Sequence, residues 1–354
     1  EDSTGALAPV PGALNKWFNT SLVKSELDYP RMPEVVLHEY DPIVDSCDLG
    51  PFEWATMAHD VFENYTFFDG FVIVTGTDTM AYAATALSFL LENLGKPVVF
   101  TGSQVPLCEP YNDARRNLIM SLIFASRDTI PEVTIFFGEK LLRACRASKI
   151  DTHRLSAFDS PNLPSLATVG ITIDEAEHLI CPPPKGALRV HTNMDTRTLT
   201  LRLVPGFDDA MIRHAIEAAK ETNLKGLVLQ FYGTGNMPSL KKDFISLLAD
   251  ATSKGVVVVA STQCQKGSVM MGHYATGQAL ASAGVVSGGD MTIEAISCKL
   301  GYLLGRGDLS YEEVVALMGV SLRGELTCLE DLPPPPFASA YQQATRRYTT
   351  RRQK

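Results

Sequence analysis

The sequence predicts an α/β protein of two domains, a larger N-terminal one with a mainly parallel sheet and flanking helices, and a smaller C-terminal α/β one. Short β-branched runs alternate with longer helical patterns along the chain, which is typical of βαβ units. Polar turns follow the apolar runs in both halves, and open parallel sheets gather their chemistry at such strand ends. A length of 354 residues suits two domains better than one.

Composition and charge exclude several classes of protein. Hydrophobic residues make up 45% and charged residues 20%, so the chain is globular rather than disordered or fibrous. Its formal net charge of −9 disfavours nucleic acid as a partner. The longest aliphatic run, residues 256–260, is far below the ~20 residues that a membrane-spanning helix needs. We therefore expect a small-molecule partner, with no nucleic acid and no membrane.

The cysteines are odd in number and widely scattered, and they form no CxxC pair. They are Cys47, Cys108, Cys145, Cys181, Cys264, Cys298 and Cys328. This pattern indicates reduced thiols in a cytoplasmic protein and neither a disulfide framework nor a zinc site.

The N-terminal half shows repeated units of strand, polar turn and helix. Residues 70–74 are a continuous apolar run, typical of a strand covered on both faces. A helix is expected over about 80–94, with Gly95 at its C-cap, because leucines recur there at helical spacing. The remaining elements expected in this half are strands at 35–40, 97–100 and 132–137 and a helix at about 113–126.

The alternation of strand and helix patterns is interrupted between residues 174 and 206, where three consecutive prolines occur. Two short strands, 188–191 and 198–203, are expected around this breaker, and a second α/β series follows with strands at 226–231 and 255–260 and a helix at 242–253. The expected division is an N-terminal catalytic domain (1–175), a linker (176–205), a C-terminal domain (206–330) and a proline-rich basic tail (331–354) that is either disordered or the start of a linker.

Thr77 and Asp78 place a hydroxyl beside a carboxylate where a buried strand ends and a helix begins. Taken alone, such a pair is more often a helix cap than a catalytic site. The turn nevertheless holds three hydroxyls where one would cap the helix, and the strand end is the expected position of a crevice.

Two other clusters have both a structural and a functional reading. The turn at Asp45-Ser46 could present a hydroxyl and backbone amides to an anion, or be only an Asp/Ser turn. Lys149 is by default a solvated lysine, and only burial beside other groups would adapt it to proton transfer. The GxG turn at 233–235 is a weak signal, and no Walker A, HExxH or GxSxG motif occurs. The histidines are isolated from one another, so neither a metal cluster nor a Ser-His-Asp arrangement is supported.

These segments, in this order, closely resemble the type I (cytosolic) L-asparaginases over nearly all of residues 6–328. The matching segments are VIVTGTDTMA (72–81), LENLGKPV (91–98), TGSQVP (101–106), SPNLP (160–164), YGTGNMP (232–238), DMTIEA (290–295) and LRGELT (322–327). The resemblance implies a two-domain asparaginase-like fold that hydrolyses asparagine to aspartate and ammonia through a threonine acyl-enzyme, without a metal or organic cofactor.

The resemblance also implies roles for individual residues. Thr77 matches a catalytic threonine that works with Lys149 and Asp78. The turn Asp45-Ser46 matches the receptor of the substrate α-carboxylate, and Asp78 that of its α-ammonium. Asn236 and Tyr274 match positions that reach the active site of a neighbouring subunit, which implies a homodimer or homotetramer. Thr262, Gln263 and Cys264 resemble a segment near a regulatory asparagine site.

The sequence departs from the family pattern at its start. The family's first strand and TGGTIG-like turn, with the first nucleophilic threonine, should stand immediately before Ser3, and Thr4 lacks the glycine turn that would make it a substitute. Three explanations are open: residues precede this sequence, the strand is a separately processed piece, or the protein is catalytically silent. We favour the first, because losing a central strand would leave buried surface unsatisfied. Cys47 stands where a second serine is commoner.

Two alternatives to an asparaginase are kept. The absent nucleophile favours a non-catalytic sensor that binds asparagine or aspartate. An amidase subunit of a transfer-RNA amidotransferase would share the fold, but it carries an additional N-terminal domain, and the acidic composition of this chain disfavours RNA.

Overall fold

A computed structural model of the protein describes residues 10–20, 32–221, 223–238, 241–271 and 275–327. The helices of these ranges are α1 (Ala13–Phe18), η1 (Ser46–Asp48), α3 (Pro51–Asn64), α4 (Met80–Leu90), α5 (Ala114–Ala125), η2 (Ala144–Arg146), η3 (Glu177–Leu179), α6 (Asp209–Glu221), α7 (Lys242–Ser253), α8 (Ala275–Ser282), α9 (Ile293–Gly305) and α10 (Tyr311–Met318). The strands are β1 (Phe71–Val74), β2 (Leu91–Glu92), β3 (Val98–Thr101), β4 (Val133–Phe137), β5 (Lys140–Arg143), β6 (Ser148–Lys149), β7 (Phe158–Asp159), β8 (Ala167–Val169), β9 (Ile173–Glu175), β10 (Arg189–Val190), β11 (Thr198–Arg202), β12 (Gly226–Phe231), β13 (Val257–Thr262) and β14 (Val286–Ser287).

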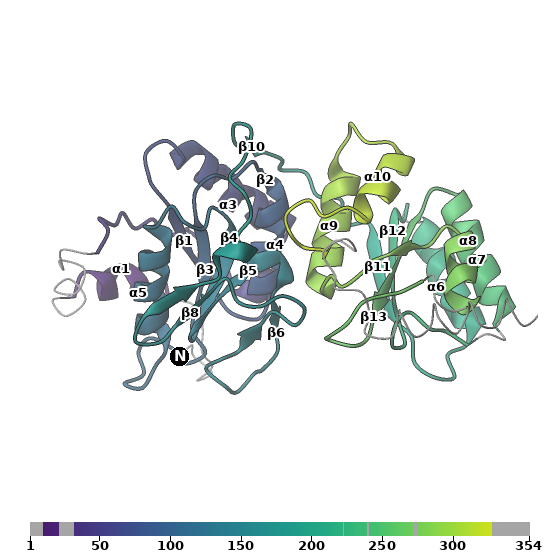
Figure 1. Ribbon diagram of the computed structural model, residues 1–354, viewed down its shortest axis with the longest axis horizontal. Coiled ribbons are helices and arrows are strands. Elements are labelled where there is room, and N and C mark those ends of the chain that lie inside the picture. Colours follow the sequence, from purple (N-terminus) through teal and green to yellow (C-terminus); the bar gives the residue numbers. More distant parts are fainter. Residues whose placement is uncertain (1–9, 21–31, 222, 239–240, 272–274, 328–354) are drawn as a thin grey trace, which may run out of the picture.

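The N-terminal half is built on a six-stranded sheet in the order β1-β3-β4-β5-β8-β9. Strands β1, β3 and β4 are parallel, and the remaining strands extend the sheet in antiparallel fashion. The register pairs Val74 with Thr101, so β1 and β3 end at the same level. Helix α5 covers one face of these strands and α4 the other (Figure 1). The turns that follow β1 and β3 are therefore neighbours in space.

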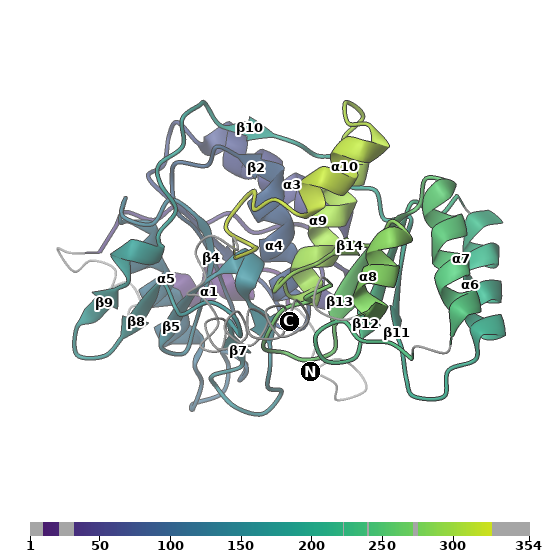
Figure 2. The same cartoon turned by 45° about the vertical axis from the view of Figure 1, so that its right-hand side comes forward.

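Helix α4 is the central element of the molecule. All its residues except Tyr82 are buried, and a helix that is apolar on every side must be covered on every side. The sheet of the N-terminal half covers one side of α4 and helix α9, from the C-terminal half, covers another (Figure 2). One apolar core therefore runs through both halves of the chain, from Phe100 on β3 through Leu87 to Leu300 and Val259.

The C-terminal half contains a four-stranded parallel sheet in the order β11-β12-β13-β14. Helices α9 and α10 lie on the face toward the N-terminal half, and α6, α7 and α8 lie on the outer face (Figure 1). A second apolar core fills the outer side, with Phe244 and Leu248 of α7 fully buried against Val258 and Ala260. The strands β12 and β13 are apolar without alternation because both of their faces are covered.

The predicted fold class is confirmed, and most predicted elements form within a residue or two of the expected bounds. Two predictions are wrong. The helix expected over 80–94 ends at Leu90, because Leu91 and Glu92 pair with β10, and Gly95 donates its N–H to Tyr65 Oη instead of capping α4. Residues 35–40 form no strand; their backbone has no ladder partner among the described residues, and the Val36 side chain is 68% exposed.

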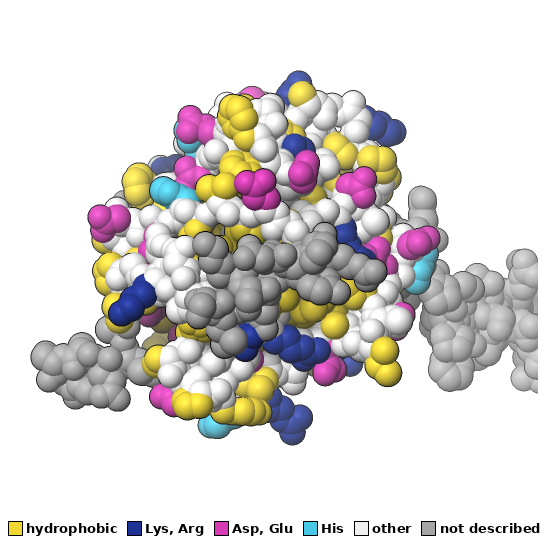
Figure 3. Space-filling view, turned by 90° about the vertical axis from the view of Figure 1, so that its left-hand side faces the viewer, with side chains coloured by type: hydrophobic (Ala, Val, Ile, Leu, Met, Phe, Trp, Pro, Cys, Tyr) yellow, Lys and Arg dark blue, Asp and Glu magenta, His cyan; other side chains and the backbone are white. Residues whose placement is uncertain are grey.

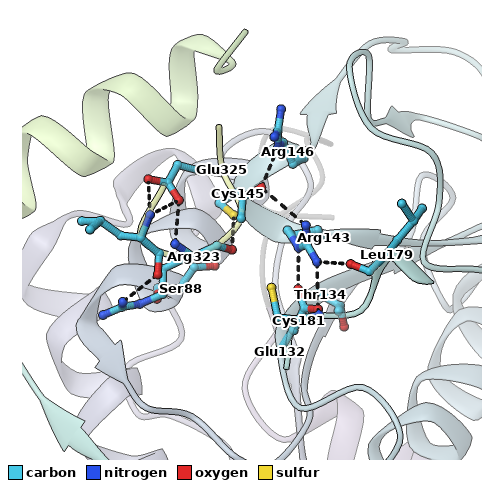
Figure 4. A network of polar contacts seen from close by, with 12 residues as sticks. Ser88, Glu132, Thr134, Arg143, Cys145, Arg146, Leu179, Cys181, Arg323 and Glu325 are labelled. Carbon is cyan, nitrogen blue, oxygen red and sulfur yellow. Dashed lines mark hydrogen bonds and ion pairs between the residues drawn. The ribbon is translucent and has the colours of Figure 1, made fainter. Parts of the chain in front are cut away.

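The segment 322–327 ties the two halves together through polar contacts (Figure 4). Arg323 donates from Nε to the carbonyl oxygen of Ser88 and from Nη2 to that of Phe89, which satisfies carbonyls of the last turn of α4. Arg146 donates from Nε to the carbonyl oxygen of Gly324 at 2.7 Å. The end of the described chain therefore holds helix α4 and the neighbourhood of Lys149 at the same time.

The outer face of the N-terminal half shows acidic and basic side chains interspersed with apolar and uncharged ones (Figure 3). Within the described ranges, no helix combines the length and apolar character needed to cross a membrane.

Candidate active site

The turn between β1 and α4 packs against the turn at Asp45-Ser46. A side chain on Gly76 would place its Cβ 2.6 Å from Ser46 Oγ, so only glycine allows this approach. The Thr79 hydroxyl donates to the carbonyl oxygen of Ser46 instead of capping α4. The Thr79 hydroxyl therefore links this turn to a segment more than thirty residues earlier in the chain.

Lys149 meets Thr77 and Asp78 although more than seventy residues separate them in the sequence. Its Nζ donates to Thr77 Oγ1 at 2.9 Å and to Asp78 Oδ1 at 2.6 Å. Strand β6 positions Lys149 by pairing it with Phe158 of β7. The lysine side chain is 16% exposed and the Asp78 side chain 63%, so the amine is shielded while the carboxylate faces outward. The structure thus brings together the three residues that were expected to act together.

The electrostatics of this group follow from the same contacts. The hydrogen bond from Lys149, reinforced by its charge, lowers the pKa of Asp78 from its ordinary value. Asp78 is therefore an anion at neutral pH and can receive an ammonium group. One of its oxygens binds Lys149, and the second accepts a weak hydrogen bond from Cys47 Sγ at 3.6 Å.

The turn that contains Ser46 lies beside this group. Asp45 caps the short helix η1 by accepting the N–H of Cys47 at 2.8 Å. Ser46 is only 3% exposed because it lies against Gly76, whereas Asp45 and Cys47 are exposed. A side-chain hydrogen bond between the thiol and Asp45, distinct from this backbone bond, is the main cause that raises the pKa of the Cys47 thiol, so the thiol stays neutral beside Asp78.

Gln104 also belongs to the site, although its residue type and position in the sequence did not predict this. The Thr77 hydroxyl donates to Gln104 Oε1 at 3.2 Å. The signal was available: Gln104 follows β3, and the parallel register of β1 and β3 brings the ends of these two strands together. Side chains in the turn after β3 should therefore have been included with Thr77.

The residues expected from the C-terminal half lie at the carboxyl end of the second sheet. Asn236 is in the turn after β12, where its Nδ2 donates to Thr234 Oγ1 at 3.4 Å. Among the described residues, no hydrogen bond or ion pair links Asn236 to Thr77, Asp78 or Lys149. Tyr274 lies outside the described residues.

The three residues at the end of β13 are bound to neighbouring backbone. The Thr262 hydroxyl donates to the carbonyl oxygen of Gly233 at 2.5 Å and accepts the N–H of Cys264 at 3.0 Å. Gln263 donates from Nε2 to two backbone carbonyls that belong to Leu203 and Gln230. In the part of the chain that the structure describes, no group of three His, Cys, Asp or Glu side chains is arranged to hold a metal ion.

Comparison with known proteins places this geometry in a family. Residues 7–180 match the family described as "Asparaginase, N-terminal", and residues 197–318 match "Glutaminase/Asparaginase C-terminal domain". The chain belongs to the asparaginase family. The relatives of this asparaginase-family chain include L-asparaginase 1 of Escherichia coli, 44% identical over 319 residues that cover 90% of this chain and 92% of the relative.

A solved structure and a longer relative complete the comparison. The crystal structure of L-asparaginase I from Vibrio cholerae is 42% identical and superimposes with a TM-score of 0.83 over 90% of this chain and 94% of that one. A 60 kDa lysophospholipase of Homo sapiens is 44% identical over 290 residues, which are 82% of this chain but only 50% of that protein. The Escherichia coli and Vibrio cholerae proteins, which match over nearly their full length, are both L-asparaginases, and this confirms the resemblance inferred from the motifs.

Proposed function

We propose that the protein hydrolyses L-asparagine to L-aspartate and ammonia. The observation that carries this function is the single amine of Lys149 bonded to both the Thr77 hydroxyl and the Asp78 carboxylate. The relatives in Escherichia coli and Vibrio cholerae, both named L-asparaginases, support the same conclusion.

The chemistry of amide hydrolysis accounts for these residue types. An amide carbonyl is a poor electrophile, so the attacking hydroxyl must lose its proton as it forms the bond. Thr77 and Lys149 provide a path for that proton, with Lys149 oriented by Asp78. The backbone amides of the turn at Gly76-Thr77 are the proposed donors to the developing oxyanion.

The zwitterionic substrate needs one receptor for each of its charges. The outward-facing carboxylate of Asp78 is the proposed partner of the α-ammonium. The turn at Asp45-Ser46 is the proposed receptor of the α-carboxylate, through the Ser46 hydroxyl and backbone N–H groups. This assignment explains why the structure holds the two turns against each other through Gly76 and Thr79.

A threonine is the proposed nucleophile, and the reaction then passes through an acyl-enzyme. The family resemblance implies a first threonine on a strand that stands before Ser3 in the family pattern. Strand β1 pairs with β3 alone among the described strands, so its other edge has no ladder partner among them.

We also infer the larger organisation from the family. Two units, residues up to about 175 and from about 206 to 330, are proposed as N-terminal catalytic and C-terminal domains joined by residues 176–205, with 331–354 as a tail. A homodimer or homotetramer is proposed, on the family resemblance, in which Asn236 and Tyr274 reach the site of a neighbouring subunit. The free thiols of the six described cysteines are consistent with the proposed cytoplasmic location.

Thr262, Gln263 and Cys264 are proposed to border a regulatory asparagine site. Sigmoidal dependence of the rate on asparagine concentration, lost in Thr262→Ala, would support this role. Strictly hyperbolic kinetics of the unmodified protein would contradict it.

The proposed function is tested with purified variants. Thr77→Ala and Lys149→Met should abolish ammonia release from L-asparagine while the thermal unfolding temperature stays close to that of the unmodified protein. The matched controls are Thr168→Ala and Lys254→Met, because both side chains are exposed and lie on other elements. Full activity in either Thr77→Ala or Lys149→Met would refute the assignment. Stabilisation by asparagine without any ammonia release from the unmodified protein would instead support a sensor.

A further inference from the structure

Lys149 lies on a strand that is too short to fix its own position. Strand β6 contains only Ser148 and Lys149, and its ladder partners are the two residues of β7. A ladder of this length has few hydrogen bonds and is weak by itself. Phe158 of β7 is buried against Phe137, so β7 is anchored in the N-terminal half. Strand β6 therefore needs further contacts to be held in one place.

The two side chains of β6 point to opposite faces of the strand, because successive side chains of a strand alternate. The Lys149 side chain faces Thr77 and Asp78. On the other face, Ser148 Oγ donates to Glu294 Oε2 at 2.9 Å. The bond to Glu294 therefore secures the back of the strand that presents the Lys149 amine to the site.

Glu294 itself has a fixed position at the start of α9. Thr292 caps this helix by accepting the N–H of Ala295 at 3.1 Å. Glu294 is only 8% exposed, and burial is the largest cause that raises its pKa. A carboxyl group that is buried to this degree is costly unless it is hydrogen-bonded. The Ser148 hydroxyl supplies such a bond from another element, so the contact is favourable for both partners.

Helix α9 is also fixed relative to the other residues of the site. It packs against α4, which begins directly after the turn that holds Thr77 and Asp78 (Figure 2). Burial and then the charge of Glu294 raise the pKa of Tyr82 on α4 to about 12, so the two side chains are close. The anchor of β6 and the two partners of Lys149 therefore share one support, formed by α4 and α9.

We propose that Glu294 is a positioning residue for amide hydrolysis, and that it acts through Ser148 to keep the Lys149 amine bonded to both Thr77 and Asp78. The inference rests on the proposed function. Among the described residues, Glu294 forms no hydrogen bond or ion pair with Thr77, Asp78 or Lys149, so it acts on the lysine through the strand.

Removing the acceptor should slow turnover and leave substrate binding nearly unchanged. Glu294→Met keeps the length of the side chain but cannot bind the Ser148 hydroxyl, so kcat for L-asparagine should fall by about tenfold. KM should stay within about threefold, because the proposed receptors of the substrate charges lie on other segments. Glu294→Gln keeps an oxygen that can accept the same hydrogen bond, and its kcat should stay within about twofold of the unmodified protein.

A double-mutant cycle tests whether the effect passes through Ser148. Ser148→Ala removes the same bond from the other side and should lower kcat about as much as Glu294→Met. Since both act through one bond, the double variant should be no slower than the slower of the two single variants. The matched control is Ser121→Ala, which removes another buried hydroxyl, bonded to the Asn117 carbonyl oxygen within α5, and should leave kcat unchanged.

Thermal unfolding and ammonia release by Lys149→Met, measured alongside, separate the possible failures. An unchanged kcat in Ser148→Ala, or a Glu294→Gln protein that folds but has lost about tenfold in kcat, overturns the role of Glu294, even where Glu294→Met does not fold. Losses that multiply in the double variant overturn it as well. If Lys149→Met is inactive in the same series, the proposed function survives that result. If Lys149→Met is fully active, the proposed function itself is wrong.

Discussion

The acidic neighbours of Cys47 alter the chemistry of its thiol. Its sulfur lies 3.6 Å from Asp78 Oδ2, and its side chain is exposed. The hydrogen bond to Asp45 is the largest cause that raises the pKa of the thiol, and Asp78 adds to it. An exposed cysteine would ordinarily be a reactive one, but thiolate and not thiol is the nucleophile. The acidic surroundings therefore protect Cys47 at neutral pH.

The first prediction follows from this protection. Iodoacetamide should modify Cys47 slowly at pH 8, and Asp45→Asn should accelerate the modification because it removes the largest cause of the raised pKa. Peptide mapping by mass spectrometry measures the rate, with the exposed Cys264 in the same digest as the internal control. Equal rates at Cys47 in the Asp45→Asn and unmodified proteins would show that Asp45 does not control this thiol.

At the scale of elements, Lys149 depends on contacts that cross from one half of the chain to the other. Asn162, which follows β7, donates to the carbonyl oxygens of Gly267 and Asp290 and accepts the N–H of Gly267 at 2.9 Å. Arg146, which precedes β6, forms an ion pair with Asp290 at 2.8 Å and is 3% exposed. The segment 144–162 that carries Lys149 is thus held at both ends by the C-terminal half.

Loosening one of these ends should reduce activity without touching the site. We expect Asn162→Ala to lower kcat by about tenfold, because small displacements of a catalytic group are costly. It should also increase hydrogen–deuterium exchange in peptides that cover residues 144–162. Asn193→Ala, at an exposed position of the connecting segment, is the control. Unchanged exchange together with unchanged kcat would mean that the contacts of Asn162 are not needed to position Lys149.

The contact between Glu92 of β2 and His191, which follows β10, should make the stability of the fold depend on pH. His191 Nε2 lies 2.6 Å from Glu92 Oε2, and this hydrogen bond is the main cause that lowers the pKa of Glu92 from its ordinary value of 4.5. A carboxyl group whose pKa is lower in the folded than in the unfolded protein stabilises the fold above its unfolded pKa, and this contribution disappears as the pH falls through the folded pKa.

We therefore expect Glu92→Gln to lower the urea midpoint at pH 6 to 7, and the difference to shrink as the pH falls below 4.5 and through the lowered pKa of the folded protein, where Glu92 loses its charge. Urea unfolding followed by circular dichroism across this range measures the difference. A constant difference at every pH would show that the ionisation of Glu92 does not contribute.

How much of these elements could be predicted depends on whether their cause is local. The strand at β1 and the turn that follows it were predictable, because an apolar run and three hydroxyls stand next to each other in the sequence. The end of α4 was not, because Leu91 leaves the helix to pair with a segment about a hundred residues away. The place of Gln104 in the site could be predicted only from the parallel register of β1 and β3, which is a property of the sheet and not of the turn.

At the scale of the whole molecule, α4 and α9 join two sheets into one core. Segment 318–327 contacts both of these helices. Lys299 of α9 and Glu325 are both fully buried, with Nζ and Oε1 2.7 Å apart. Lys299 also donates to the carbonyl oxygens of Met318 and Val320, and Glu325 accepts the N–H groups of Leu322 and Arg323. This pair therefore fixes the loop whose Arg323 binds the end of α4.

The last prediction concerns the buried carboxylate. Burial raises the pKa of Glu325, but the charge and hydrogen bond of Lys299 outweigh it and hold the pKa below its ordinary value, so the group is ionised at neutral pH. Glu325→Gln leaves the Lys299 ammonium buried without a counter-charge and should lower the free energy of unfolding by about 3–5 kcal/mol at pH 7. Urea unfolding measures this change.

Asp308→Asn provides the matched control, because Asp308 forms an ion pair with Arg306 but is 63% exposed, and solvent screening leaves such a surface pair with little effect on stability. The loss in Glu325→Gln should shrink as the pH falls, since the carboxyl group of the unmodified protein then becomes protonated and leaves Lys299 in the same position. If Glu325→Gln were no more destabilising than Asp308→Asn, the buried pair could not be what holds segment 318–327 over the two halves. The apolar contact between α4 and α9 would then have to hold them together without it.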